Sequence, residues 1–320
     1  LVQECLLDGA NDTNPTCTGY HIESGHYYLG ASDSTFSQHF VGVYSSATEK
    51  VEVAKDVVLD LSGYSLTSTG RVFYVRPANA SANVPQSSLT VLDSYGGGKL
   101  TGSGANTQTG GVIYNENGLL TIYGGKYIYK RVEGRNIPGG GVFNAGSNLT
   151  IHGGVIDGST FAYTDQSTSD KKYTYNGGAI TSTNGVKYFT MTSGVIMGGH
   201  AQEGGAVFFG NRNVVNITGG QFIGGSSDGN GGVIRLSSAE SYTSKSYFNM
   251  SNAAVRNGYA TTAGGNLYTH YYQVNIENCY LDGGTTADFG GNANVGSAAN
   301  AVIKNTISFT IFFFLSVRRI

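Results

Sequence analysis

The acidic residues and histidines are the side chains of this sequence that could carry acid–base chemistry. Hydrolysis of a glycosidic bond needs two carboxyl groups about 5 to 10 Å apart. A lyase needs acidic residues that bind a cation and a basic residue that takes a proton. Asp157 and Asp282 fall at equivalent outward points of a repeat unit, but four units separate them, and the units between carry Met197, Ile223 and Arg256 there. We therefore expect no catalytic pair from these two.

Two further combinations are close enough in the sequence to consider. Asp60 and Asp93 are candidate neighbours on the first two repeat units, and His200 lies near Glu203. Isolated groups of this kind are also typical of solvated turns. The chain has no HExxH, paired CxxC, GxSxG or phosphate-loop motif. The sequence predicts no catalytic residue, no metal ligand and no cofactor.

A doubled glycine followed by two mostly apolar residues recurs along the chain and indicates what positions these side chains. The second glycines are 26 to 37 residues apart, at positions 111, 141, 178, 205, 232, 265 and 291. A period in this range is typical of stacked supersecondary units that cannot bury their apolar faces alone. The doubled glycines are therefore interpreted as corner residues and not as a nucleotide-binding loop.

Short alternating segments follow each glycine pair and predict strands with one buried face. Three such strands in a unit of roughly 27 residues describe a coil of a parallel β-helix. Superposing the units predicts three interior ladders: Leu149, Phe189, Val215, Phe248 and Val274; Ile151, Met191, Ile217, Met250 and Ile276; Ile156, Ile196, Phe222, Val255 and Leu281. The fold class is all-β, a right-handed parallel β-helix.

A small residue separates two of the strands in each unit. Gly154, Gly194, Gly220 and Ala253 share this position, where a larger side chain would collide with the next coil. Cys279 follows in the same column. We predict a small buried thiol there, with a catalytic or intermolecular cysteine as the alternative.

Earlier segments extend the repeat, so that about nine coils are expected over residues 51–309. Residues 1–50 lack the repeat and are interpreted as an N-terminal cap, and residues 310–320 as an apolar tail. Only 12% of residues are charged and the net charge is −2. This composition argues against binding to nucleic acid or anionic lipid.

Cysteines and sequons point to an extracellular protein. Cys5 and Cys17 are twelve residues apart and are the candidate disulfide of an oxidising compartment. Acceptor triplets for N-glycosylation occur at Asn11, Asn79, Asn148, Asn216 and Asn249. The last three are expected on one solvent-facing sheet, where the alternative is an asparagine ladder that is hydrogen-bonded along the stack.

The apolar C-terminal segment is too short to span a bilayer. It contains Ile311, Phe312, Phe313, Phe314 and Leu315 and ends in Arg318-Arg319-Ile320. Exposed, this run would promote aggregation. Three interpretations stay open: a cap strand, a segment that docks onto a neighbouring subunit, and an error of gene prediction.

The repeats resemble those of secreted right-handed β-helix adhesins. Gly-Gly-Val/Ala followed by Ile, Val or Phe, and then Leu-Thr-Ile-X-Gly-Gly, is similar to the GGAI-like repeats of polymorphic outer-membrane proteins and autotransporter passengers. Tyr114-Asn115 and Phe143-Asn144 echo their FxxN motif without its spacing. The resemblance covers about residues 89–300 and implies surface exposure, adhesion or fibre formation.

Three functions follow as hypotheses. The first is an extracellular structural or adhesive glycoprotein, the subunit of a filament assembled head-to-tail, with itself and cell-surface polysaccharide as partners. Open coil ends favour such assembly because they present unpaired backbone groups. The second is a β-helical polysaccharide lyase or glycoside hydrolase, which a cleft with clustered carboxylates and a basic residue would favour. A binding module that does not polymerise is a third.

Overall fold

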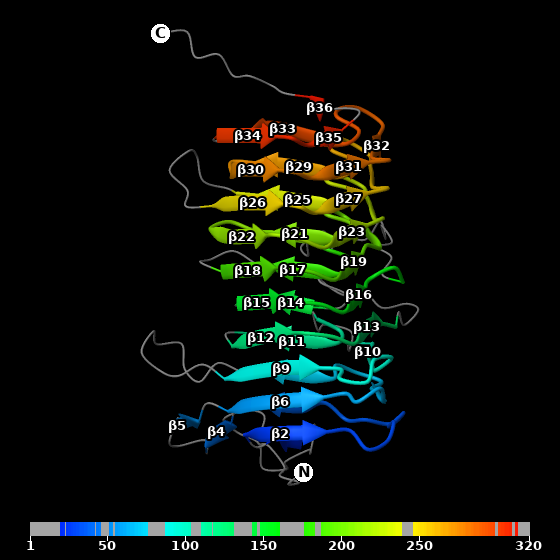
Figure 1. The fold of residues 1–320 in the computed structure, drawn as a ribbon, viewed down its shortest axis with the longest axis vertical. Coiled ribbons are helices and arrows are strands. Elements are labelled where there is room, and N and C mark those ends of the chain that lie inside the picture. The colour runs from blue at the N-terminus through cyan, green and yellow to red at the C-terminus, as the bar shows by residue number, and fades with distance from the viewer. Residues whose placement is uncertain are drawn as a thin grey trace, which may run out of the picture.

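The protein is a parallel β-solenoid built from strands stacked along one long axis (Figure 1). The computed structural model describes residues 20–22, 24–41, 43–45, 51–53, 55–75, 87–103, 110–116, 118–130, 143–145, 148–160, 176–182, 187–238, 246–297, 300–308 and 311–312. Every regular element in this part of the chain is a β-strand. The all-β repeat fold predicted from the sequence is confirmed.

Three long parallel sheets form the sides of the stack. The first sheet runs β1 (Tyr20–Ile22), β3 (His39–Val41), β8 (Phe73–Val75), β11 (Ile113–Asn115), β14 (Phe143–Ala145), β17 (Ile180–Ser182), β21 (Val207–Phe209), β25 (Ile234–Ser237), β29 (Leu267–His270), β33 (Ala293–Ser297) and β36 (Ile311–Phe312). The second sheet runs β2 (Gly25–Tyr28), β6 (Asp56–Asp60), β9 (Ser88–Leu92), β12 (Leu119–Ile122), β15 (Asn148–Ile151), β18 (Lys187–Met191), β22 (Asn213–Ile217), β26 (Tyr247–Ser251), β30 (Gln273–Glu277) and β34 (Asn300–Lys304).

The third sheet and two smaller sheets complete the fold. The third sheet runs β7 (Ser65–Thr67), β10 (Lys99–Gly102), β13 (Lys126–Tyr129), β16 (Val155–Asp157), β19 (Val195–Met197), β23 (Gln221–Ile223), β27 (Ala254–Arg256), β31 (Tyr280–Asp282) and β35 (Ile307–Ser308). The fourth sheet runs β20 (His200–Ala201), β24 (Ser226–Ser227), β28 (Tyr259–Ala260) and β32 (Thr285–Thr286). The strands β4 (Val43–Ser45) and β5 (Val51–Val53) form an antiparallel pair.

The stack is slightly longer than the nine coils expected. The third sheet holds nine strands, the second ten and the first eleven. The additional strands come from the segment interpreted as a cap, because β2 pairs in parallel with β6, and β1 and β3 pair in parallel below β8.

The interior ladders have the register predicted from the repeat. In the second sheet, Leu149 pairs with Phe189, which leads on to Val215, Phe248 and Val274. The other two ladders follow the same coil-by-coil pairing, Ile151 through Ile276 in the second sheet and Ile156 through Leu281 in the third. All of these side chains are buried. Their stacked burial is the main stabilising contribution to the fold.

The doubled glycines have two separate physical causes. In the described pairs the first glycine is left-handed, with φ of 71°, 65°, 68° and 67° at Gly177, Gly204, Gly231 and Gly264. The second has no room for a side chain, because a Cβ on Gly205 would overlap the Gly232 carbonyl oxygen of the next coil. The same overlap repeats from coil to coil. The first glycine is therefore required by a left-handed turn, and the second by close contact with the backbone of the next coil.

Candidate functional site

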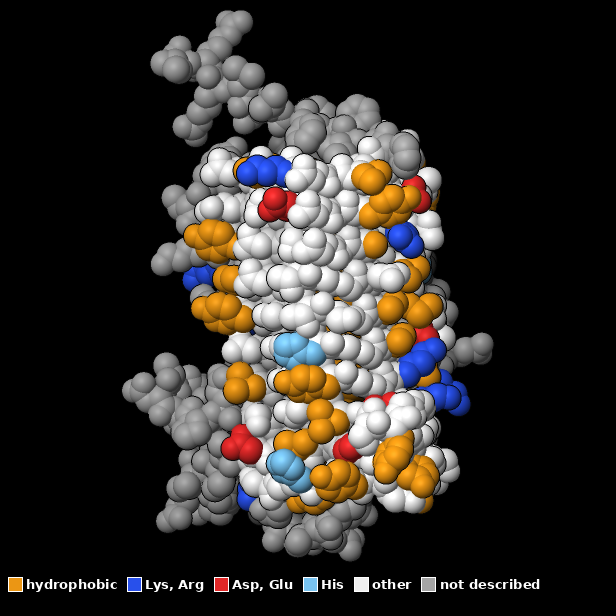
Figure 2. All heavy atoms as spheres, in the orientation of Figure 1, with side chains coloured by type: hydrophobic (Ala, Val, Ile, Leu, Met, Phe, Trp, Pro, Cys, Tyr) orange, Lys and Arg blue, Asp and Glu red, His pale blue; other side chains and the backbone are white. Residues whose placement is uncertain are grey.

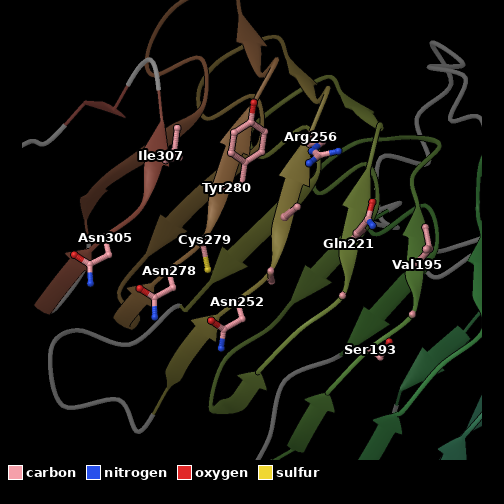
Figure 3. Close-up of a pocket in the computed structure, with 14 residues that line it drawn as sticks. Ser193, Val195, Gln221, Asn252, Arg256, Asn278, Cys279, Tyr280, Asn305 and Ile307 are labelled. Atoms are coloured by element: carbon pink, nitrogen blue, oxygen red, sulfur yellow. The ribbon is translucent and has the colours of Figure 1, made fainter.

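A groove on the outer surface of the third sheet is the candidate site (Figure 3). Its volume is about 810 Å³, and it crosses the strands β19, β23, β27, β31 and β35. The lining residues are Ser193, Gly194, Val195, Gly220, Gln221, Asn252, Ala253, Ala254, Arg256, Asn278, Cys279, Tyr280, Asn305 and Ile307. The groove therefore runs along the solenoid axis.

Small residues in the outward columns hollow out this groove. The outward residues at the start of these strands are in register as Val195, Gln221, Ala254, Tyr280 and Ile307. Ala254 leaves a low point in the column, and Tyr280 rises beside it in the next coil. Neighbouring strands of the third sheet can thus carry outward side chains of very different size, while their inward side chains all remain apolar.

Three asparagines form one edge of the groove. Asn252, Asn278 and Asn305 precede β27, β31 and β35, and their side chains point the same way in a row (Figure 3). Each is exposed and has left-handed backbone geometry, with φ of 52°, 53° and 47°. Asparagine tolerates this region better than most residues with a Cβ.

The corner is therefore built differently in the later coils than the sequence suggests. Gly154, Gly194 and Gly220 are the left-handed residues of their coils, with φ of 85°, 103° and 99°. From Asn252 onward the left-handed position moves one residue earlier, so that Ala253 and Cys279 need no glycine-like geometry. The prediction that small residues occupy this column holds, but its cause changes along the stack.

Arg256 and Tyr280 form the other polar part of the groove. The guanidinium carbon of Arg256 lies 4.9 Å from the centre of the Tyr280 ring, which is a cation–π contact. The Tyr280 hydroxyl donates to a carboxylate oxygen of Asp282 at 3.2 Å. The Nε atom of Arg256 is buried and has no hydrogen-bond partner among the described residues. Tyr280 is thus held in place by groups from two coils.

Cys279 is a buried free thiol, as predicted. Its Sγ lies 3.5 Å from the Met250 carbonyl oxygen and 3.3 Å from that of Glu277. Burial raises the pKa of this thiol above its ordinary value. A buried thiol with a raised pKa is a weak nucleophile, and Cys279 contributes packing to the groove wall.

The lining is suited to binding rather than to bond cleavage. Arg256 is the one charged residue among the fourteen that line the groove, and no carboxylate or histidine is among them. Amide side chains both donate and accept hydrogen bonds, and the Tyr280 ring provides an apolar face. Hydroxyl-rich ligands with apolar ring faces match this combination.

The acidic residues singled out from the sequence have structural partners. Asp157 and Asp282 are equivalent and four strand steps apart, as predicted, through Met197, Ile223 and Arg256. The Asp157 carboxylate lies 2.8 Å from the Lys126 ammonium group.

Asp60 and Asp93 lie in adjacent coils and support turns. Asp60 accepts hydrogen bonds from the backbone N–H groups of Ser62 and Ser94 at 2.8 and 3.0 Å. Asp93 accepts from those of Gly63 and Gly98 at 2.9 and 2.8 Å. Both carboxylates therefore accept hydrogen bonds from the backbone of neighbouring turns.

A second polar cluster lies beside the fourth sheet and involves partners that sequence reasoning did not identify. His200 contacts the Ser226 hydroxyl through Nδ1 at 2.8 Å and an Asp228 carboxylate oxygen through Nε2 at 3.2 Å. Glu203 pairs instead with the Arg235 Nε at 3.0 Å. These partners lie one coil onward, so only the register of the stack reveals them. The available signal was the repeat itself, which places Ser226 in register with His200, 26 residues onward in the chain.

Three of the five candidate glycosylation sites lie on the outer surface of the second sheet. Asn148 accepts a hydrogen bond from the Tyr188 backbone N–H at 3.3 Å. Asn249 donates to the Asn216 side-chain oxygen at 3.0 Å, so these two form part of an asparagine ladder. Figure 2 shows one long face of the stack, on which charged side chains are few.

The remaining predicted residues fall outside the described part of the chain. They are Cys5, Cys17, Asn11, Asn79, Phe313, Phe314 and Leu315. For Ile311 and Phe312 the backbone is described as β36, which pairs in parallel with β33.

The described residues contain no candidate metal site and no candidate membrane-spanning helix. No group of three or more His, Cys, Asp or Glu side chains within the described ranges could hold a metal ion. None of the described segments is a helix long and apolar enough to cross a membrane. Comparison with protein-family models, curated proteins and solved structures finds no match to this chain.

Proposed function

We propose that this chain is an extracellular adhesive β-solenoid that binds glycans in the groove of the third sheet without cleaving them. The observation that carries the proposal is the groove lining, which combines Gln221, three exposed asparagines, Arg256 and Tyr280 without a carboxylate. Hydrogen-bonding amides and an aromatic ring recognise sugars, whereas glycosidic bond cleavage needs acidic groups. The repetitive, rigid scaffold supports a binding surface in preference to a closing active site.

Adhesion is tested with fluorescently labelled protein and beads that carry immobilised cell-surface polysaccharides. The wild-type protein is expected to be retained on at least one polysaccharide. Tyr280→Ala should reduce retention severalfold, because it removes the aromatic face of the groove. Tyr188→Ala is the matched control, since Tyr188 is 51% exposed on the second sheet. Absence of retention on every bead, or equal loss in both variants, would contradict the proposal.

We also propose that copies of the chain assemble head-to-tail into a filament. Support comes from the last strands of the three long sheets, β34, β35 and β36, which pair on one side alone among the described residues. Val302 and Ile307, in β34 and β35, are 43% and 58% exposed. Unpaired strand edges and exposed apolar side chains favour association with another copy.

Electron microscopy of the native protein tests this assembly. Filaments with an axial repeat of about 40 to 60 Å are expected, since ten strand steps span about 48 Å. A deletion of 311–320, which removes Ile311 to Leu315, should weaken assembly and leave the circular dichroism of the coils unchanged. Isolated short rods from the full chain would remove the filament proposal and leave glycan adhesion standing.

An enzyme of the polysaccharide lyase or hydrolase type is the second candidate, and the cluster beside the fourth sheet favours it. There Glu203, Asp228, His200 and Arg235 come from adjacent coils. Reducing ends or unsaturated products released by the wild-type protein and lost in Glu203→Gln would establish this activity. Groove variants such as Tyr280→Ala would separate binding from turnover.

The extracellular location and glycosylation are part of the same proposal. Five sequons and the Cys5 and Cys17 pair support them. The likeness of the repeats to autotransporter passengers supports a surface role in the same way. Mass spectrometry of the protein from its native source, with and without glycosidase treatment, tests occupancy of Asn148, Asn216 and Asn249.

A further inference from the structure

The asparagine row of the groove points to a more specific ligand. We propose that Asn252, Asn278 and Asn305 bind successive sugars of an uncharged, extended polysaccharide that lies along the solenoid axis. This inference rests on the proposed adhesive function and names the chemical class and direction of its ligand.

The backbone does not require asparagine at these corners. The preceding coils turn with a glycine as the left-handed residue, at Gly194 and Gly220. Three consecutive coils instead place an asparagine in a left-handed conformation that glycine adopts at lower cost. Within the described residues, none of the three amides makes a side-chain hydrogen bond. The row therefore presents donors and acceptors that the fold itself leaves unused.

The spacing of the three amides along the solenoid axis matches the length of one sugar in an extended chain. Adjacent strands of a sheet are about 4.8 Å apart, so the three amides repeat at about that interval along the axis. One sugar of an extended β-1,4-linked chain is roughly as long as one strand step. Successive sugars of such a chain face opposite ways, so neighbouring amides meet different hydroxyls, and each amide can donate to or accept from whichever hydroxyl faces it.

The charges that line the groove favour an uncharged ligand. The groups that repeat with the coil are neutral amides, whereas the groove has a single cation, Arg256. A polyanion would need a cation at each step to offset the desolvation of its charges. Asp282 is the register neighbour of Arg256 and accepts from Tyr280, which adds a negative charge close to the groove. The ligand that fits is an uncharged chain, one sugar of which meets the Tyr280 ring.

Glycine variants test the row without disturbing the turn. The combined variant Asn252→Gly, Asn278→Gly and Asn305→Gly keeps the left-handed backbone and removes the amides. Asn257→Gly is the matched control, because Asn257 has φ of 60° and lies outside the groove lining. Circular dichroism melting shows whether each variant retains the fold.

Calorimetric titration with cellohexaose and mannohexaose, which are uncharged β-1,4-linked chains, gives the decisive comparison. The wild-type protein should bind at least one of them, and the Kd should be nearly the same at about 50 mM and about 500 mM NaCl. The combined variant should raise that Kd about tenfold or more, and Asn257→Gly should change it less than twofold.

Three results would overturn the inference. One is that the combined variant folds and binds the hexamer with the same Kd as the wild-type protein. Another is binding of an oligogalacturonate hexamer alone, with a Kd that rises steeply with salt, which would assign a polyanion. The third is retention on polysaccharide beads without binding of either uncharged hexamer, in which case adhesion stands and the ligand class fails. If the wild-type protein is retained on none of the polysaccharide beads, the proposed function itself is rejected.

Discussion

At the scale of single residues, the left-handed glycines decide whether coils can stack. Gly154 has φ of 85°, and a Cβ there would lie 2.7 Å from the Gly125 carbonyl oxygen and 3.0 Å from that of Gly124. Gly96 has a similar φ of 73° but open space around its Cβ position. A side chain at position 96 would therefore cause backbone strain alone, whereas one at position 154 would also collide with the neighbouring coil.

We expect Gly154→Ala to lower the free energy of unfolding by about 2 to 4 kcal/mol, since strain and overlap add. Gly96→Ala should cost about 1 kcal/mol, because strain alone applies. Urea denaturation followed by circular dichroism measures both. Equal losses in the two variants would show that contact between coils is not what requires glycine at position 154.

Asp157 gives a pH-dependent prediction at the same scale. Burial opposes ionisation of this carboxyl group, but hydrogen bonds from Lys126 and Ser159 outweigh it and lower its pKa below the ordinary value of 3.8. A carboxyl pKa that is lower in the folded state stabilises the fold above the unfolded pKa. This contribution is lost as the pH falls through the folded pKa.

Asp157→Asn should therefore destabilise the protein by about 1 to 2 kcal/mol at pH 7. The melting temperature of the variant should fall less than that of the wild type between about pH 4 and pH 2. Asp56→Asn, at an exposed carboxylate, serves as the control and should keep the wild-type acid profile. Parallel acid profiles for wild type and Asp157→Asn would refute the assignment.

At the scale of the strand, the alternation of apolar and polar residues made the interior predictable. Strands β9 to β30 of the second sheet bury alternate side chains, so the register of Leu149 against Phe189 and Val215 follows from superposing the repeats. The groove was not predictable in the same way. The groove depends on outward residues such as Ala254, because packing in the core does not restrict their size. It also depends on the left-handed corner residue, which is Asn252 in this coil and lies one position earlier than in the preceding coils.

Buried polar residues also escaped sequence reasoning. Asn266 follows a glycine pair where the earlier repeats have an apolar residue, yet it is fully buried. Its amide donates to the carbonyl oxygens of Val255 and Asp282 and to the Asn292 side chain, and it accepts from the Gly258 N–H. Such a residue is recognised only once its partners in neighbouring coils are known.

The ladder in the third sheet gives the prediction for this scale. Phe222 is fully buried between Ile196 and Val255. Phe222→Ala should cost about 3 to 5 kcal/mol by leaving a cavity, and Phe222→Leu less than about 1.5 kcal/mol. Because each coil contacts only its neighbours, hydrogen exchange should accelerate first in β19, β23 and β27. Uniform acceleration along the whole stack would instead indicate a single cooperative unit.

At the scale of the whole molecule, the solenoid separates stability from recognition. The inward ladders and glycine turns hold the coils together, while the outward columns vary from coil to coil without affecting that packing. The same stack can thus carry an amide-lined groove on the third sheet and a cluster of ionisable residues beside the fourth sheet. This is why the fold follows from the repeat, whereas the function depends on the exceptions to it.

Binding without cleavage is checked by one calorimetric experiment with a soluble cell-surface polysaccharide. We predict a saturable heat of binding that returns to baseline after each injection, that is weakened in Tyr280→Ala and that is unchanged in Glu203→Gln. A heat flow that continues after binding saturates, and that disappears in Glu203→Gln, would contradict the account and identify the protein as an enzyme.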